Sequence, residues 1–323
     1  MELIIIMKKI LLISCLLIAY LTGYTQVSPV IQLSDSARIF GEGVISQGHS
    51  ESNASFTLDS KTVYFSKGSL NAAYRAIFYS TLKDAQWTKP EAVSFTGVYR
   101  DTDPLVSPDG KRLYFLSDRP VNGKPFTDRD YHFFYVELNG NKVASEPKQF
   151  NLPLTDGLKP LYLSFADNGN VYFLGLDNNN EAHIYKCEFK NGNYLPPVSM
   201  SFSDKKYNDL DPVVADDESF MIFASTNRKG YGSSDLWVSF NNNGAWAEPV
   251  NMGNKINTKG SDGAPGLSRD HKTLYFSSYR EKPERPVYKD GKATTKEVLD
   301  LLYATKNGAS NIYEINISDL KEP

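Results

Sequence analysis

Carboxylate side chains recur at one position of a repeated sequence pattern, and they are the groups best suited to chemistry. The position is held by Glu51, Asp101, Asp209 and Asp262, and in one further repeat by Lys159. Asp103 and Asp211 add two carboxylates two residues further on. A ring of carboxylates can bind a cation, a sugar or a basic peptide. Two carboxylates at a defined separation can also hydrolyse a glycosidic bond.

Basic side chains recur about 16 to 19 residues after these carboxylates. They are Lys67, Arg119, Arg228 and Arg280. In a structural interpretation, each acid bonds local backbone N–H groups or pairs with the arginine of the neighbouring repeat. In a functional interpretation, acids and bases bind a ligand together. The candidate binding residues are then His49, Asp101, Asp103, Arg119, Lys159, Asp209, Asp211, Arg228, Asp262 and Arg280.

The remaining signals for catalysis or metal binding are weak. His49 lies in "QGHSES", at a place where the repeat symmetry breaks. His132, His183 and His271 fall in separate repeats, so we expect no zinc site and no cofactor. Neither a G-x-S-x-G, an H-E-x-x-H nor a P-loop pattern is present. We therefore expect no catalytic residues, unless Glu51, Asp101, Asp209 and Asp262 serve a carbohydrate-active enzyme.

The repeat that carries these residues is defined by an aromatic marker at the end of a short apolar run. The markers are Phe65, Phe115, Phe173, Phe223 and Phe276. Twelve residues before them stand Asn53, Asp103, Leu161, Asp211 and Ala264. Such constant spacing over about 50 residues is typical of a solenoid, propeller or other repeat architecture.

Each repeat predicts four strands. "PLVS" and "RLYFLS" are joined by the turn "PDGK", where Pro108 presets φ and Gly110 permits a positive φ. The inner strands are apolar on both faces, as expected for propeller blades covered on both sides. We predict an all-β, five-bladed propeller with four-stranded blades spanning residues 26–323. Because the fifth repeat lacks a fourth strand, we expect residues 27–33 to pair with the strand around 311–317 and close the ring.

The motif "DTDPLVSPDGKRLYFLSDR" at 101–119, with "GYGSSDLW" and "NNGAWAEPVNMGNKIN" within 230–257, resembles the PD40 (WD40-like) repeats of TolB-like propellers. It is most similar to versions from secreted and envelope proteins of the Bacteroidetes. The resemblance covers nearly all of the chain after residue 25 and implies the fold more than a function. TolB-like propellers usually carry one blade more than the five counted here.

The fifth repeat is interrupted by residues 281–310. "EKPERPVYKDGKA" is polar and predicts a loop, and "TTKEVLDLLYATKNG" predicts a helix with a capping box at Thr294 and Glu297. Val298, Leu301 and Leu302 form an apolar stripe, so we expect the helix to dock onto the propeller. A docked helix would hold Arg285, Tyr288 and Lys289 beside the channel mouth. A lineage-specific decoration is the alternative.

Residues 1–25 have the layout of a secretory signal peptide, with lysines, an apolar run and small or polar residues near Thr25. A membrane anchor and lipidation at Cys15 are the less favoured alternatives. The run Ile10 to Leu21 is short for a membrane span. Cys187 alternates with polar neighbours and is expected to be a buried strand residue.

Charge and composition narrow the function. A net charge of −3 with mixed signs argues against a nucleic-acid partner. We expect an exported monomer, periplasmic or at the cell surface, with an envelope protein or a glycan as its ligand. The expected function is non-catalytic binding or scaffolding, and a glycoside hydrolase or lyase is the alternative.

Overall fold

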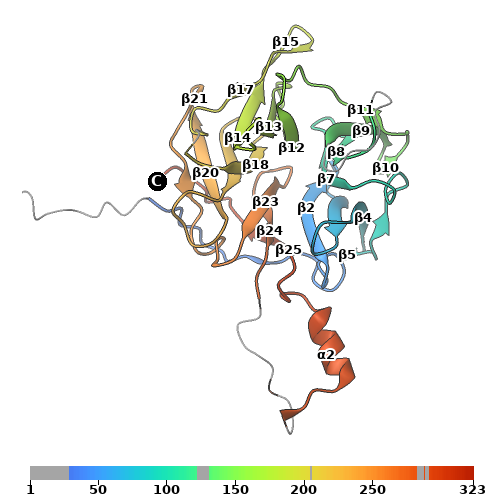
Figure 1. Cartoon of the computed structure of the whole chain (residues 1–323). Coiled ribbons are helices and arrows are strands. Elements are labelled where there is room, and N and C mark those ends of the chain that lie inside the picture. Colours follow the sequence, from blue (N-terminus) through green and yellow to red (C-terminus); the bar gives the residue numbers. More distant parts are fainter. Residues whose placement is uncertain (1–28, 122–130, 204–205, 282–286, 288–290) are drawn as a thin grey trace, which may run out of the picture.

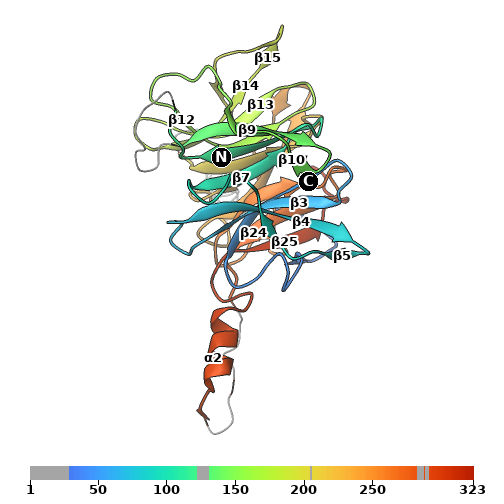
Figure 2. The same ribbon diagram turned by 90° about the vertical axis from the view of Figure 1, so that its right-hand side faces the viewer.

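The computed structural model describes residues 29–121, 131–203, 206–281, 287 and 291–323. The strands of these residues form five blades around a central channel and a small two-stranded sheet, and helix α2 lies outside the ring (Figures 1 and 2). This arrangement confirms the predicted all-β, five-bladed propeller. The signal-peptide prediction for residues 1–25 lies outside the described residues. Among the described residues, no helix has the length and apolar character needed to cross a membrane.

The first three blades follow the order of the sequence, each with its innermost strand at the channel. Blade 1 contains β2 (Ser50–Phe56), β3 (Thr62–Gly68), β4 (Arg75–Lys83), β5 (Gln86–Trp87) and β6 (Glu91–Ala92). Blade 2 contains β7 (Asp101–Val106), β8 (Arg112–Ser117), β9 (His132–Asn139), β10 (Lys142–Val143) and β11 (Lys148–Gln149). Blade 3 contains β12 (Lys159–Phe165), β13 (Val171–Leu176), β14 (Ala182–Cys187), β17 (Val198–Ser199) and the hairpin β15 (Phe189–Lys190) to β16 (Asn193–Tyr194).

The last two blades complete the ring. Blade 4 contains β18 (Asp209–Val214), β19 (Phe220–Ser225), β20 (Asp235–Asn242), β21 (Ala245–Trp246) and β22 (Val250–Asn251). Blade 5 contains β23 (Asp262–Leu267), β24 (Thr273–Ser278), β25 (Asn311–Asn316) and, as its outer strand, β1 (Arg38–Ile39). In blades 1, 2 and 4 the fourth strand is split into two short segments that both pair with the third strand.

Local sequence explains the regular blades. In the turn before β8, Gly110 has a φ of 69°, and the hydroxyl of Ser107 donates to Asp109 Oδ1 over 2.6 Å. The middle strands are buried on both faces, because each blade packs against two neighbours. Cys187, at the end of β14, is a buried strand residue as predicted, and burial raises the pKa of its thiol to about 11.

A β-bulge interrupts the first strand of every blade. The bulges contain residues with positive φ at Asn53, Asp103, Tyr162, Asp211 and Ala264. In blade 3 the bulged residue follows Leu161, the residue that stands twelve before the aromatic marker. Leu161 pairs regularly with Leu174, and Tyr162 is the bulged residue. A bulge bends its strand and redirects side chains, so it sets which residues face the channel.

The N-terminal segment closes the ring, but with other residues than expected. Arg38 and Ile39 pair with Glu314 and Tyr313 of β25, whereas Val30 forms a parallel bridge with Asn251 of blade 4. The expected pairing of residues 27–33 with blade 5 is therefore wrong. The segment from residue 30 to residue 39 instead spans two blades.

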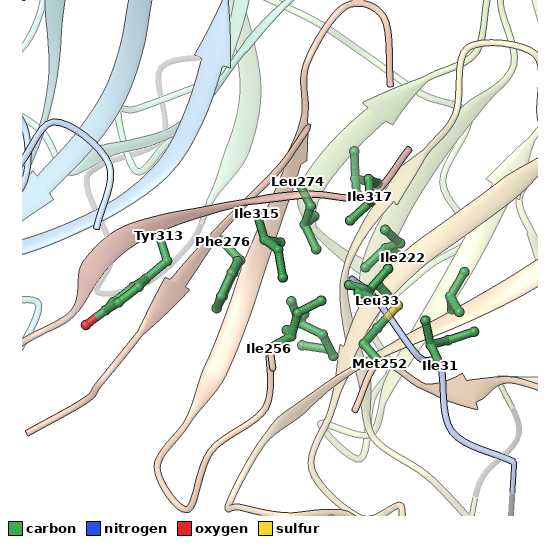
Figure 3. Close-up of a cluster of buried hydrophobic side chains, with 14 of the residues drawn as sticks. Ile31, Leu33, Ile222, Met252, Ile256, Leu274, Phe276, Tyr313, Ile315 and Ile317 are labelled. Carbon is green, nitrogen blue, oxygen red and sulfur yellow. The ribbon is translucent and has the colours of Figure 1, made fainter. Parts of the chain in front are cut away.

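The side chains of this segment complete a buried cluster. Ile31 and Leu33 are 5% exposed and pack among residues of blades 4 and 5, including Met252 and Ile317 (Figure 3). Phe40, next in the chain after β1, packs edge-on against Phe56 of blade 1 at 5.8 Å between ring centroids. The N-terminal segment thus joins blades 4, 5 and 1.

The insertion contains the predicted helix, but the helix does not dock. Helix α2 (Thr295–Leu302) begins with the expected capping box at Thr294 and Glu297 and has no buried residue. It extends away from the ring (Figures 1 and 2), with Val298 and Leu302 exposed. The expected docking is wrong, because the helix meets the ring only beyond its C-terminal end, where the Asn307 amide donates to Gly48 O at 3.1 Å. The predicted loop residues Arg285, Tyr288 and Lys289 lie outside the described residues.

We predict that Leu33→Ala lowers the free energy of unfolding by about 2–5 kcal/mol, because it removes a buried side chain from the closure of the ring. Gln32→Ala is the matched control, since Gln32 is exposed and surface substitutions change stability by about 0.5 kcal/mol or less. Urea unfolding measures both. Equal effects of the two substitutions would show that the segment does not close the ring.

Candidate functional site

Four of the repeated carboxylates form buried ion pairs within their own blades. Arg228 binds Asp209 through two hydrogen bonds of 2.9 and 3.0 Å, and Arg119 Nη2 lies 2.7 Å from Asp101 Oδ1. The two looser pairs are Lys67 with Glu51 at 3.6 Å and Arg280 with Asp262 at 3.8 Å. Each pair therefore joins the first strand of a blade to the end of the second. The expectation of an arginine from the neighbouring blade is wrong. The alternative, bonding to local backbone N–H groups, is confirmed at Glu51 by Gln47 N at 3.2 Å and at Asp262 by Thr258 N at 2.7 Å.

These carboxylates are sealed from solvent. The side chains of Glu51, Asp101, Asp209 and Asp262 are all 0% exposed. Burial raises the pKa of Glu51 to about 7 and also raises the pKa of Asp101 and of Asp262. None of the four lines the central cavity. In this structure they act as internal links of their blades.

Blade 3 departs from the pattern. Pro160, paired with Gly175, stands at the place that Asp101 and Asp209 hold in their blades, as the register of the bulge shows. The expected assignment of Lys159 to this place is wrong. Counting back from Phe173 placed it one residue too early, because the hairpin between the first two strands is one residue shorter in blade 3 than in blade 2. Lys159 is exposed at the start of β12 and does not line the cavity.

A cavity of about 1580 Å³ opens at one end of the central channel. Three of the expected binding residues, His49, Asp103 and Asp211, line it. The others do not, and they are Asp101, Arg119, Lys159, Asp209, Arg228, Asp262 and Arg280. The sequence pattern therefore found both the structural links and part of the cavity, without distinguishing them.

The bulged residues form the floor of the cavity. The Tyr162 hydroxyl crosses the channel and donates to Pro265 O at 2.6 Å. Below this level lies a much smaller space of about 70 Å³, where the Arg269 guanidinium donates to Phe56 O at 2.8 Å and to Val106 O at 3.2 Å. The channel is thus narrow at the floor and wide at the mouth.

Asp103 and Asp211 are an unequal pair at this floor. Burial raises the pKa of both, and for Asp211 the nearby Asp103 charge adds to the effect and brings its pKa to about 7. The guanidinium of Arg75 opposes the shift at Asp103. At neutral pH the pair can therefore accept hydrogen bonds, and Asp211 can also donate one.

The mouth of the cavity is lined by residues that the sequence analysis did not identify. Aromatic rings come from loops of blades 1, 2 and 5, namely Tyr74, Tyr99, Tyr131 and Tyr279. Tyr74 is 80% exposed and Tyr279 is 46% exposed. These loops differ between blades, so no repeat position marked them. Clustered tyrosines next to short polar loops were the available signal.

No protein-family model and no curated protein sequence matches the chain. Among solved structures, a TolB-like protein from Agrobacterium tumefaciens is similar, with 16% identity over 83% of this chain and 90% of that one and a TM-score of 0.46. An α-L-arabinofuranosidase from Lactobacillus brevis gives 13% identity over 84% and 91%, with a TM-score of 0.49. A protein of unknown function from Dyadobacter fermentans gives 12% identity over 86% and 98%, with a TM-score of 0.47.

At 12–16% identity and with TM-scores below 0.5, these likenesses do not transfer a ligand or an activity to this chain. The resemblance to PD40 repeats stays a prediction, since no family model matches. The site must therefore be judged from its own residues.

We predict that Asp209→Asn lowers the free energy of unfolding by about 3–5 kcal/mol, because it leaves the buried Arg228 guanidinium without a counter-charge. Asp209→Leu combined with Arg228→Leu should cost less than this single change, since no charge then remains buried. Asp35→Asn, at an exposed position, is the control. If the double variant loses as much stability as Asp209→Leu and Arg228→Leu lose in sum when each is made alone, the ion-pair account is contradicted.

A second prediction concerns pH. Because the folded pKa of Asp211 lies above its unfolded value, protonation favours the folded state, and this contribution is lost as pH rises from about 4 to about 7. Asp211→Asn removes that loss. The variant should therefore gain Tm relative to the parent at pH 8 and gain less at pH 4. A Tm difference independent of pH would show that Asp211 titrates normally.

Proposed function

We propose that the chain is an exported, non-catalytic binding protein of the cell envelope, and that its central cavity binds an oligosaccharide. The observation that carries this proposal is the cavity of about 1580 Å³, open at one end and lined by both tyrosine rings and hydrogen-bonding side chains. Ligand pockets characteristically combine apolar or aromatic walls with a few placed polar groups. Export rests on the signal-peptide pattern of residues 1–25.

The aromatic side chains favour a carbohydrate. Tyr74 and Tyr279 present exposed rings from blades 1 and 5 to the cavity. A tyrosine offers an apolar face and a hydroxyl together. The C–H face of a sugar ring packs on the first, and sugar hydroxyls bond to the second.

The charges favour a ligand with little net charge. The lining contains Lys67, Arg75 and Arg100 against Asp103, Asp118 and Asp211. Two of the cations are already paired, Arg100 with Asp118 at 2.5 Å and Lys67 with the buried Glu51 at 3.6 Å. The cavity therefore lacks the single-sign field that would select a strongly charged ligand. Neutral hydroxyl groups can bond to both kinds of side chain.

Burial of the repeated carboxylates supports a non-catalytic role. A glycosidase needs two accessible carboxyl groups on either side of the scissile bond, and Glu51, Asp101, Asp209 and Asp262 have no exposed side-chain surface. One observation favours a second function, glycoside hydrolysis. Asp211, with a pKa of about 7 beside Asp103, has the protonation of a general acid.

We predict that Tyr74→Ala weakens oligosaccharide binding by about tenfold, or about 1.4 kcal/mol, without changing Tm. Tyr231→Ala is the matched control, because Tyr231 is 44% exposed and does not line the cavity. A glycan array identifies the ligand, and titration calorimetry measures both variants. Equal affinities of the two variants, or an array on which no glycan binds, would contradict a glycan site in the cavity.

The same ligand distinguishes binding from hydrolysis. Incubation of the bound glycan with the parent protein should return it intact, as judged by mass spectrometry. Release of shorter products that stops with Asp211→Asn would show that the second function is the correct one.

A further inference from the structure

A cluster of potential metal ligands lies in blade 3, outside the central cavity. Asp177 and Glu181 belong to the turn between β13 and β14, and His183 is the second residue of β14. Their ligand atoms all lie within 4.8 Å of one another. His183 Nε2 is 3.9 Å from Glu181 Oε2. The sequence analysis missed this cluster because it searched for a second histidine and not for two carboxylates beside one.

His183 is buried with its hydrogen-bonding capacity unused. The residue is 5% exposed, and neither ring nitrogen has a hydrogen-bond partner among the described residues. Glu181 Oε2 is likewise buried without such a partner. Leaving a buried polar group unsatisfied is costly, and native structures rarely do so. An imidazole nitrogen 3.9 Å from a carboxylate oxygen is too far for a hydrogen bond, yet a metal ion between them would bind both.

The equivalent positions in blades 4 and 5 hold polar side chains that do have hydrogen-bond partners. There the position holds Asp235, which pairs with Ser225, and Asn311, which pairs with Ser278. The carboxylate of Asp235 accepts the backbone N–H groups of Tyr231 and Gly232 over 2.6 and 3.0 Å. The side-chain oxygen of Asn311 accepts from Lys306 N at 2.9 Å.

Asp235 and Asn311 thus stabilise the neighbouring loops by hydrogen bonds to backbone N–H groups, whereas the ring nitrogens of His183 make no hydrogen bond to a described residue. The cross-strand neighbour of His183 is Gly175, and Pro160 lies beyond Gly175. Neither of these residues has a side chain that could donate or accept. Within blade 3, the available partners for the imidazole are therefore the carboxylates of the turn.

We propose that Asp177, Glu181 and His183 bind a divalent first-row transition ion of the Zn²⁺ type. One imidazole nitrogen and two carboxylate oxygens are a ligand set that zinc accepts. Ca²⁺ and Mg²⁺ prefer oxygen ligands alone. Three protein ligands leave a coordination position open for water or for a donor atom of a ligand.

The turn is suited to this role. Asp177 Oδ1 already accepts Asn179 N at 2.8 Å and Glu181 N at 2.9 Å, so the carboxylate is held in a fixed orientation. Ligand bonds of about 2.1 Å in a tetrahedron bring ligand atoms to about 3.4 Å apart. The turn must therefore close by about 1 Å on the buried histidine when the ion binds.

The experiment measures Zn²⁺ binding to the untagged mature chain by equilibrium dialysis with elemental analysis. We expect one Zn²⁺ per chain at micromolar concentration, and at least tenfold weaker binding in both His183→Gln and Glu181→Gln. Asp156→Asn is the matched control, because it removes an exposed carboxylate from the loop before β12. This variant should bind Zn²⁺ as tightly as the parent. Ca²⁺ and Mg²⁺ at the same concentration should not compete.

A second readout keeps the result independent of folding defects. Co²⁺ bound to the parent should give the visible absorption of a low-symmetry site. This band should be absent in Glu181→Gln, at a position where the side chain is 40% exposed and the substitution should leave the fold intact. The proposal is overturned if the parent binds no stoichiometric Zn²⁺. It is also overturned if either His183→Gln or Glu181→Gln binds as tightly as the parent while circular dichroism shows it folded.

Discussion

Closure of the ring is the constraint on which the rest of the structure depends. Unless its ends meet, a row of five blades leaves one face of the first blade and one face of the last blade uncovered, and without β1 the outer edge of β25 would be unpaired. The segment from Val30 to Phe40 meets this need by bridging to blade 4, pairing with β25 in blade 5 and packing on blade 1. At the narrow end of the channel, Arg269 adds a second link from blade 5 to blades 1 and 2.

The closed ring separates residues that repeat from residues that do not. The repeated acidic and basic side chains form ion pairs inside the blades, as in the buried pair of Asp209 and Arg228. The bulges then direct Asp103, Tyr162 and Asp211 to the floor of the cavity. Loops that differ between blades supply the mouth. The candidate site is thus asymmetric although the scaffold is nearly symmetric.

The repeat made the fold predictable, and its irregularities were the parts that could not be predicted. Constant spacing from Phe65 to Phe276 was enough for five blades. The hairpin of blade 3 is one residue shorter than that of blade 2, because Phe165 pairs with Val171 whereas Val106 pairs with Leu113. Counting back from the aromatic marker therefore assigned Lys159 to the place of Pro160. An amphipathic stripe indicates a helix but not its partner, and α2 keeps its apolar side chains exposed. The tyrosines of the cavity come together only through the closure of the ring.

The central claim is that ligand binds at the wide end of the channel, over the floor formed by Asp103 and Asp211. Hydrogen–deuterium exchange of the full chain, with and without the best-bound oligosaccharide, tests it most directly. The account predicts slower exchange confined to the cavity segments 67–76 and 97–103, with the outer strands unchanged. Protection of the outer strands or of the Arg269 end, with these two segments unaffected, would contradict it.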